Sequence, residues 1–214
     1  MHVDLLVPVK PLARAKTRLL GAADDGAGSP QAHARLALAL ARDTLSAAAA
    51  AAAVRRVVAI CSDEVVRGTL AEDGFEAITD EPATGLNPVL RHGEDLLRAA
   101  RPTAAVGALQ ADLPALRPEE LDRALRDGLA GGVRVFCADR SGTGTTLLLA
   151  PRGLPLDPRF GPDSAAAHRA SGARELSGSW PGLRCDVDTV ADLARARDLG
   201  LGRFTRAALA GVPR

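Results

Sequence analysis

Short apolar runs alternate with longer segments of helical periodicity along this chain. Most of these runs contain β-branched or other aliphatic residues and end at proline, glycine or a charged side chain, which is typical of buried strands. The pattern of strands alternating with helices predicts an α/β fold with a largely parallel central sheet. The runs are Val3–Val9, Val54–Cys61, Phe75–Thr79, Ala104–Leu109, Val133–Ala138, Thr145–Ala150 and Leu183–Val187.

Helical segments are expected between most of these runs. The connection 139–144 is too short for a helical crossover, so the strands on either side of it should be antiparallel. The predicted sheet is therefore mixed but mostly parallel, with helices flanking it. The expected helices are Gln31–Ala53, a segment that starts at Ser62–Asp63, and then Pro88–Ala100, Pro118–Leu129, Asp163–Ser171 and Ala191–Leu199.

Length and composition narrow the classes of function. The 214 residues fit one domain, 1–214, and 27 basic side chains nearly balance 26 acidic ones. This balance, with four Phe, one Trp and no Tyr, argues against extended nucleic-acid binding. The three cysteines lack CxxC spacing and lie in strand-like runs, which indicates reduced thiols. No apolar run reaches the roughly 20 residues that span a bilayer, so we expect a cytoplasmic protein without a membrane partner.

The first candidate for chemistry is Asp112, which follows the apolar run 104–109 and precedes Pro114. Proline cannot extend a sheet ladder, so this acid should fall at the carboxyl end of the strand. Ligands of open α/β sheets bind at that edge, and a carboxylate there is well placed to hold a divalent metal ion. The alternative is that Asp112 only caps the helix that starts near Pro118.

A second group of acids, Asp186 and Asp188, lies at the end of the predicted strand 183–187. If that strand lies near the central one, carboxylates from distant parts of the chain converge on one metal ion. The alternative role is capping, because Asp188 and Thr189 precede the predicted helix 191–199. We expect one of these two residues to cap that helix.

The loop after the first strand is rich in positive charge. At the carboxyl end of a strand, its basic side chains can meet a triphosphate. The alternative is a solvated basic loop, and the location of the basic residues favours nucleotide binding more than their number does. The basic residues of this loop are Lys10, Arg14, Lys16 and Arg18.

Two further segments combine a glycine with a helix start. Gly85 and Asn87 precede Pro88, and spacing alone favours Asn87 as an N-cap, although a backbone with glycine can also line a nucleobase pocket. Gly161 and Ser164 open the helix near 164, where free N–H groups and a hydroxyl make an anion site. Capping by Ser164 or its neighbour Asp163 is the alternative there, and both roles can hold at once.

Five segments carry a family resemblance, and they are PVKPLARAKTRL at 8–19, LQADLPAL at 109–116, GTGTTLLL at 142–149, FGPDSAAAH at 160–168 and RCDVDT at 184–189. In this order they resemble the guanylyltransferases that make the deazaflavin coenzyme F-420. The resemblance covers nearly the whole chain and implies a single-domain Rossmann-like fold of the GT-A-like nucleotidyltransferase kind. It implies condensation of GTP with phosphoenolpyruvate to enolpyruvoyl-2-diphospho-5'-guanosine and pyrophosphate, as in the bacterial branch, with 2-phospho-L-lactate as the alternative acceptor.

The resemblance also implies roles for individual residues. Lys16 best matches the lysine of the glycine-rich GGxGxR-type signature of related nucleotidyltransferases, a signature that this chain otherwise lacks. Asp112 and Asp186 hold Mg²⁺, with Asp188 as the alternate ligand, and these two acids and Lys16 form the catalytic set. The implied phosphoenolpyruvate-binding residues are Thr146, Gly161 and Ser164, and those for the nucleotide are Lys10, Arg14, Lys16, Gly85 and Asn87.

Two other functions stay open. One is a related nucleotidyltransferase with another base or acceptor, such as a cytidylyl- or molybdopterin-type enzyme. The other is a non-catalytic nucleotide-binding domain, which has little need for acids at both 112 and 186–188. For the enzyme, hand-over of product to the downstream transferase of the pathway is a further expectation.

Overall fold

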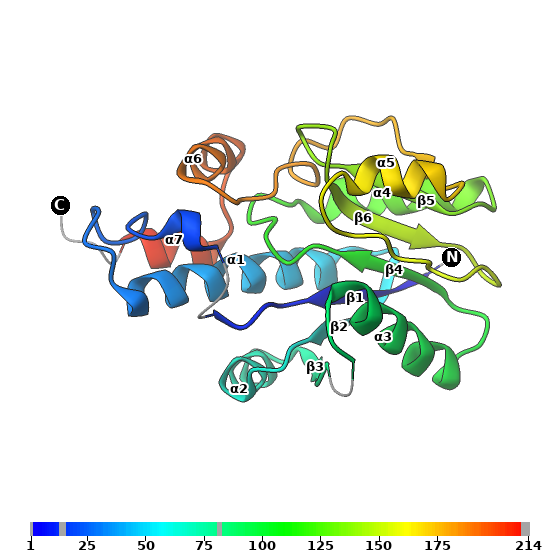
Figure 1. Cartoon of the computed structure of the whole chain (residues 1–214), viewed down its shortest axis with the longest axis horizontal. Coiled ribbons are helices and arrows are strands. Elements are labelled where there is room, and N and C mark those ends of the chain that lie inside the picture. Colours follow the sequence, from blue (N-terminus) through cyan, green and yellow to red (C-terminus); the bar gives the residue numbers. More distant parts are fainter. Residues whose placement is uncertain (1, 13–15, 81–82, 211–214) are drawn as a thin grey trace.

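A mixed sheet forms the centre of the computed structural model, which describes residues 2–12, 16–80 and 83–210. Within these ranges, seven strands have the order β3-β2-β1-β4-β6-β5-β7 (Figure 1). The first six along the chain fall within runs that the sequence predicted as strands. Their bounds are β1 Val3–Pro8, β2 Val54–Ile60, β3 Glu76–Ile78, β4 Ala105–Leu109, β5 Val135–Ala138, β6 Thr145–Ala150 and β7 Arg174–Glu175.

The strand directions set the position of the loops. β1 runs parallel to β2 and β4, and β2 runs parallel to β3. β6 is antiparallel to both β4 and β5, which confirms the antiparallel pair expected from the short connection 139–144. Because β1 and β4 are adjacent and parallel, the loops that follow them lie at the same edge of the sheet.

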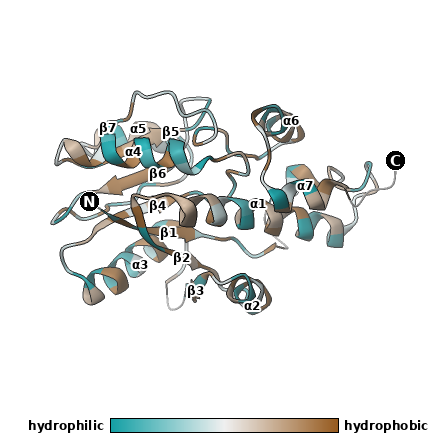
Figure 2. Ribbon diagram, turned by 180° about the vertical axis from the view of Figure 1, so that it is seen from behind, coloured by the Kyte–Doolittle hydropathy of each residue, from teal (hydrophilic) through white to brown (hydrophobic). Residues whose placement is uncertain are grey.

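Helices cover both faces of the sheet (Figure 1). Side chains alternate along β1, so that Leu5 and Val7 pack in one core cluster with α1, α2 and α4, whereas Leu6 packs with α3 and α5 on the other face. Figure 2 shows the central strands in the hydrophobic colour, as expected for a sheet buried on both faces. The helices are α1 Pro30–Ala50, α2 Glu64–Glu72, α3 Leu86–Ala100, α4 Pro118–Ala130, α5 Ser164–Ala170, α6 Val190–Leu199 and α7 Arg203–Ala210, with a short 3-10 helix η2 Thr17–Leu19.

The helix α3 lies close to the sheet because it carries a glycine at the contact. A Cβ atom at Gly93 would lie 2.7 Å from Cδ1 of Ile60 and 3.1 Å from Cδ1 of Leu6. This close approach brings the middle of α3 against β1 and β2, and the amino-terminal end of α3 belongs to the candidate site described below. None of the helices in the described ranges combines the length and apolar character needed to cross a membrane.

The predicted strand Leu183–Val187 is wrong. These residues, all within the described part of the chain, lie in turns and irregular backbone rather than in the sheet. N–H groups of this segment have partners outside a ladder. Those of Gly182 and Leu183 donate to the Glu120 carboxylate, at 2.9 and 3.2 Å, and that of Val187 donates to the carbonyl oxygen of Asp112, at 3.0 Å.

The helix α7 was not predicted from the sequence. Asp43 of α1 stabilises its start, because the Asp43 carboxylate accepts hydrogen bonds from the N–H groups of Phe204 and Thr205, at 3.0 and 2.7 Å. α6 and α7 pack with the amino-terminal half of α1 in a third apolar cluster (Figure 1). The loop after β4 is thus flanked by α1 and by the segment that leads into α6.

Candidate functional site

Asp112 lies in the loop that follows β4, as the sequence predicted. Hydrogen bonding between β4 and β6 continues one residue beyond β4, because the N–H of Gln110 donates to the carbonyl oxygen of Thr146 at 2.9 Å. The capping role considered for Asp112 is wrong, because α4 begins at Pro118 and its N-cap residue is Arg117. The carboxylate of Asp112 is therefore available for other partners.

The acids at 186 and 188 come beside Asp112 without a strand between them. Val187 N–H donates a hydrogen bond of 3.0 Å to the carbonyl oxygen of Asp112. Thr189, and not Asp188, caps α6, in a capping box with Asp192. Asp186 and Asp188 thus lie near Asp112, in a segment that a backbone hydrogen bond joins to the loop after β4.

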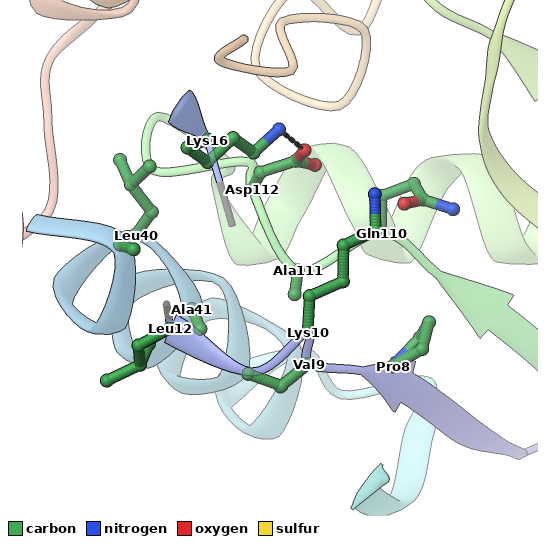
Figure 3. A pocket seen from close by; sticks show the side chains of 11 residues that line it. Pro8, Val9, Lys10, Leu12, Lys16, Leu40, Ala41, Gln110, Ala111 and Asp112 are labelled. Atoms are coloured by element: carbon green, nitrogen blue, oxygen red, sulfur yellow. Dashed lines mark hydrogen bonds and ion pairs between the residues drawn. The ribbon is translucent and has the colours of Figure 1, made fainter. Parts of the chain in front are cut away.

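Lys16 lies between two of these acids. Its ammonium group forms an ion pair with Asp112 (Figure 3). It forms a second ion pair, at 2.5 Å, with Asp188. Burial by itself lowers the pKa of Lys16, but Coulombic attraction and hydrogen bonds from the two carboxylates outweigh it, so the pKa is raised. The residue adopts a left-handed backbone with φ 54°. Lys16 is thus a protonated cation directed at the acids rather than a residue of a solvated loop.

Two features of the acids suit an additional cation. Within the described part of the chain, the buried Oδ1 of Asp112 has no hydrogen-bond partner, which is costly for a carboxylate oxygen. Burial raises the pKa of Asp186 to about 7, and neighbouring carboxylates, above all Asp112, add to the rise. A divalent cation held by Asp112 and Asp186 would satisfy the first atom and favour the charged form of the second.

The described residues contain no group of three or more His, Cys, Asp or Glu side chains arranged to enclose a metal ion. Such a cage is not needed for Mg²⁺ in a nucleotide site, since this ion is usually held by one or two carboxylates together with substrate phosphates. The donor set present here fits that second kind of site.

A pocket opens beside the Lys16–Asp112 pair (Figure 3). It has about 450 Å³ of empty space, part of it open to solvent. The loops after β1 and β4 supply Lys10, Lys16, Gln110 and Asp112 to its wall, and α1 supplies an apolar side that includes Leu40. Polar groups at one end and aliphatic groups at the other are typical of a small-molecule site at the carboxyl edge of an α/β sheet.

The residues predicted to bind the acceptor lie in a second group. Thr146 and Ser164 are both buried, and the two segments meet where Ala165 N–H donates to the carbonyl oxygen of Thr143 at 3.0 Å. The Thr146 hydroxyl donates to the carbonyl oxygen of Cys137 at 3.4 Å. Gly161 is exposed and has φ 142°, a backbone conformation that other residues rarely adopt.

Capping does not explain the start of α5. Asp163 is the N-cap residue but has a left-handed backbone and makes no capping bond with its side chain. Ser164 is already the first helical residue, so its hydroxyl is not an N-cap either. Thr146, Gly161 and Ser164 do not line the pocket of Figure 3, although the carbonyl oxygen of Thr146 accepts a hydrogen bond from Gln110, which does line it.

The structure corrects the capping role expected for Asn87. α3 begins two residues earlier than expected, at Leu86, with Gly85 at the N-cap and φ 90°. The Asn87 side chain instead pairs with the backbone of Phe160: its amide nitrogen donates to the Phe160 carbonyl at 2.9 Å, and its oxygen accepts from the Phe160 N–H at 2.7 Å. Asn87 therefore ties the start of α3 to the residue before Gly161.

His168 holds the same segment from the other side. Its Nε2 accepts a hydrogen bond from the N–H of Arg159 at 3.0 Å, so the proton is on Nδ1, which lies 2.9 Å from the hydroxyl of Thr145. Burial lowers the pKa of His168 to about 4, which keeps the ring neutral. One buried imidazole thus joins β6, α5 and the segment that ends at Gly161.

The sequence prediction missed two residues that hold these loops. The sequence presents His168 as the last residue of the FGPDSAAAH motif, and its position one helical turn after Ser164 is a signal that could identify it. The second residue, Thr44 of α1, contacts the loop of Asp112. The sequence signal for it is a polar side chain among apolar residues at helical spacing. Arg14, predicted to bind nucleotide, lies outside the described residues, while Arg18 is exposed.

Comparisons with known sequences agree with the motifs. The model of a family described as guanylyl transferase CofC like matches residues 3–175. The phosphoenolpyruvate guanylyltransferase of Thermomonospora curvata is 50% identical over 211 residues, which cover 98% of this chain and 90% of that protein. The enzyme of the same name from Streptomyces avermitilis is 49% identical, and the match covers 98% and 95% of the two chains.

Solved structures share the fold at lower identity. A putative nucleotide-diphospho-sugar transferase from Desulfovibrio desulfuricans has a TM-score of 0.71 at 21% identity, with 98% of this chain and 94% of that chain covered. A manganese complex of Rv0371C from Mycobacterium tuberculosis has a TM-score of 0.58 at 21% identity, with 92% and 98% covered. The α/β fold expected from the sequence is confirmed, and the chain belongs to the CofC-like guanylyl transferase family.

Proposed function

We propose that this protein transfers the guanylyl group of GTP to phosphoenolpyruvate, as a step of coenzyme F-420 biosynthesis. The observation that carries the proposal is the meeting of Lys16 with Asp112 and Asp188 at the carboxyl edge of the sheet, in a chain of a guanylyl transferase family. Relatives named phosphoenolpyruvate guanylyltransferase, at 50% and 49% identity, support the choice of acceptor. The products are enolpyruvoyl-2-diphospho-5'-guanosine and pyrophosphate.

The reaction is a displacement at phosphorus. A phosphate oxygen of phosphoenolpyruvate attacks the α-phosphorus of GTP, the bond from that phosphorus to the bridging oxygen breaks, and pyrophosphate leaves. Both substrates are polyanions, so the protein must hold them together and neutralise charge. Lys16 exchanges its carboxylate partners for the phosphates of bound GTP and stabilises the leaving pyrophosphate, and no covalent intermediate with the enzyme is required.

Asp112 and Asp186 hold Mg²⁺ in this proposal, with Asp188 as the alternate ligand. The ion supplies positive charge to the phosphate oxygens when it is bound. The unpartnered Oδ1 of Asp112 and the raised pKa of Asp186 support this assignment, and so does a manganese complex among the structures of the same fold.

The remaining assignments follow the family motifs. We place phosphoenolpyruvate at Thr146, Gly161 and Ser164, whose segments meet at the hydrogen bond between Ala165 and Thr143. The chain acts as one nucleotidyltransferase domain, 1–214, in the cytoplasm, and passes its product to the next transferase of the pathway. The proposed nucleotide-binding residues are Lys10, Arg14, Lys16, Gly85 and Asn87.

A turnover experiment tests this function. Purified protein, MgCl₂ and one nucleoside triphosphate are mixed with phosphoenolpyruvate or 2-phospho-L-lactate, and pyrophosphate release is followed while mass spectrometry identifies the product. The downstream transferase is added if the product proves unstable. We expect release with GTP and phosphoenolpyruvate and its loss with EDTA. Release with CTP in place of GTP would point to another nucleotidyltransferase, and no release with any pair would point to a binding domain.

A further inference from the structure

The hydroxyl of Thr44 lies between α1 and the loop that carries Asp112. Thr44 is fully buried, and its Oγ1 accepts a hydrogen bond from the N–H of Leu113 at 2.9 Å. The same oxygen lies 3.1 Å from the carbonyl oxygen of Ala111 and 3.0 Å from that of Leu40. One side chain of α1 therefore contacts the backbone on both sides of Asp112.

This arrangement differs from that of an ordinary helical hydroxyl. Ser46, on the same helix, donates only to the carbonyl four residues earlier, that of Arg42, at 2.7 Å. Thr44 has the equivalent neighbour in Leu40 but also reaches across to residues 111 and 113. Because a hydroxyl has one proton and two lone pairs, it can accept from Leu113 and still donate to a carbonyl oxygen.

The side chain of Asp112 depends on this backbone for its direction. Among the described residues, its buried Oδ1 has no hydrogen-bond partner and Lys16 is the side chain that pairs with the carboxylate, so the backbone has a large part in its orientation. The bond from Val187 holds the Asp112 carbonyl, and the Thr44 hydroxyl holds the peptide groups on either side. The same face of α1 lines the pocket one turn earlier, at Leu40 and Ala41.

We propose that Thr44 is a positioning residue, which sets the orientation of the Asp112 carboxylate for a divalent cation and so supports turnover. The inference rests on the proposed function, in which Asp112 is a metal ligand. Groups that orient a ligand in this way typically change metal affinity or activity by about 10–100-fold when they are removed. We expect an effect of that size from a substitution that removes only the hydroxyl.

The test compares four variants with the wild-type protein. Thr44→Val keeps the branched shape without the hydroxyl, and Thr44→Ser keeps the hydroxyl without the methyl group. Ser46→Ala removes a hydroxyl of α1 that does not reach the loop, and Asp112→Asn removes the proposed ligand. Mn²⁺ binding is titrated by electron paramagnetic resonance without substrates, below the unfolding temperature of every variant, and kcat and KM for GTP are measured in parallel.

We expect Thr44→Val to weaken Mn²⁺ binding about tenfold and to lower kcat, while Thr44→Ser and Ser46→Ala stay near wild type. Wild-type Mn²⁺ affinity in Thr44→Val, with binding lost in Asp112→Asn, would overturn the role of Thr44 alone. Wild-type affinity in Asp112→Asn would overturn the metal assignment, and the inference with it. If Thr44→Val does not fold, Thr44→Cys replaces it, since a thiol keeps the size but is a weak hydrogen-bonding group.

Discussion

The backbone N–H of Val187 donates a hydrogen bond of 3.0 Å to the carbonyl oxygen of Asp112. Val187 itself is buried in the apolar cluster between α1 and α6, whereas Asp188 on its carboxyl-terminal side is exposed and reaches Lys16. One buried valine thus anchors the acidic segment beside the loop after β4. This hydrogen bond joins two segments that are more than 70 residues apart in the sequence, so that Asp188 and Asp112 both reach Lys16.

Substitution of Asp112 by asparagine should abolish turnover and leave the protein folded. The residue lies in a loop and makes no contribution to the apolar clusters, so we expect the melting temperature to stay within a few degrees of wild type. Steady-state assays of pyrophosphate release and thermal unfolding check the two parts. Asp73→Asn, which breaks the remote ion pair with Arg42, is the matched control and should keep full activity. A large fall in melting temperature without a specific loss of activity would contradict the prediction.

Substitution of Ser164 by alanine should raise the KM for phosphoenolpyruvate much more than the KM for GTP. The buried hydroxyl makes no capping bond at the start of α5, and we expect it to bind an anionic group of the acceptor. Loss of one hydrogen bond to a charged group costs about 1.5–3 kcal/mol, which is roughly a 10- to 150-fold change in affinity. Initial rates with each substrate varied in turn give the two constants.

Ser171→Ala is the control for this experiment. Ser171 lies just after α5, and its hydroxyl donates to the carbonyl oxygen of His168 at 2.8 Å, so its loss perturbs the same helix at the opposite end. We expect both KM values to stay near wild type in this variant. Equal damage to the two KM values in Ser164→Ala would mean that the hydroxyl has a structural role only.

His168 should make the free energy of unfolding depend on pH. Burial lowers its pKa to about 4 in the folded protein, against about 6.5 in an unfolded chain, so the unfolded state binds the proton more readily. The contribution of neutral His168 to the free energy of unfolding is present in full above pH 6.5. It is lost as the pH falls from 6.5 to 4, and the loss is about 3 kcal/mol in total. Protonation would also set an N–H of the ring against the N–H of Arg159.

Urea unfolding at several pH values, in wild type and in His168→Gln, checks this prediction. The glutamine does not titrate, so stability of the variant should fall less steeply between pH 6.5 and 4. The same substitution at the partly exposed His92 of α3 is the control and should keep the wild-type slope. Parallel slopes for wild type and His168→Gln would show that His168 does not control the acid sensitivity.

The activation free energies of guanylyl transfer to the two candidate acceptors should differ only slightly. Phosphoenolpyruvate and 2-phospho-L-lactate share a phosphate and a carboxylate and differ at one carbon, so the residues that bind the shared groups cannot discriminate between them. When such a small difference between substrates is sensed by an apolar pocket wall, it typically changes the activation free energy by about 1–3 kcal/mol. With both acceptors at equal concentration and limiting enzyme, we expect the phosphoenolpyruvate product to dominate. A dominant phospholactate product would change the acceptor and leave guanylyl transfer intact.

Local sequence determined most of the secondary structure and pointed to the candidate site residues. Six strands fall where apolar runs are bounded by proline, glycine or charge, because burial of a strand and termination of a ladder both depend on nearby residues. The position of Asp112 after β4 followed in the same way. The helix starts at Asp63 and Thr189 were also predictable, since capping is a contact within one turn.

Only the tertiary structure decided which distant residues meet. Asp43 caps α7 and Glu120 replaces a strand partner for Gly182 and Leu183, so the sequence pattern missed a helix and predicted a strand that does not form. Asn87, with the spacing of a cap, pairs with Phe160 instead. A side-chain carboxylate or amide can satisfy a backbone group from any part of the chain, and spacing along the sequence carries no information on such contacts.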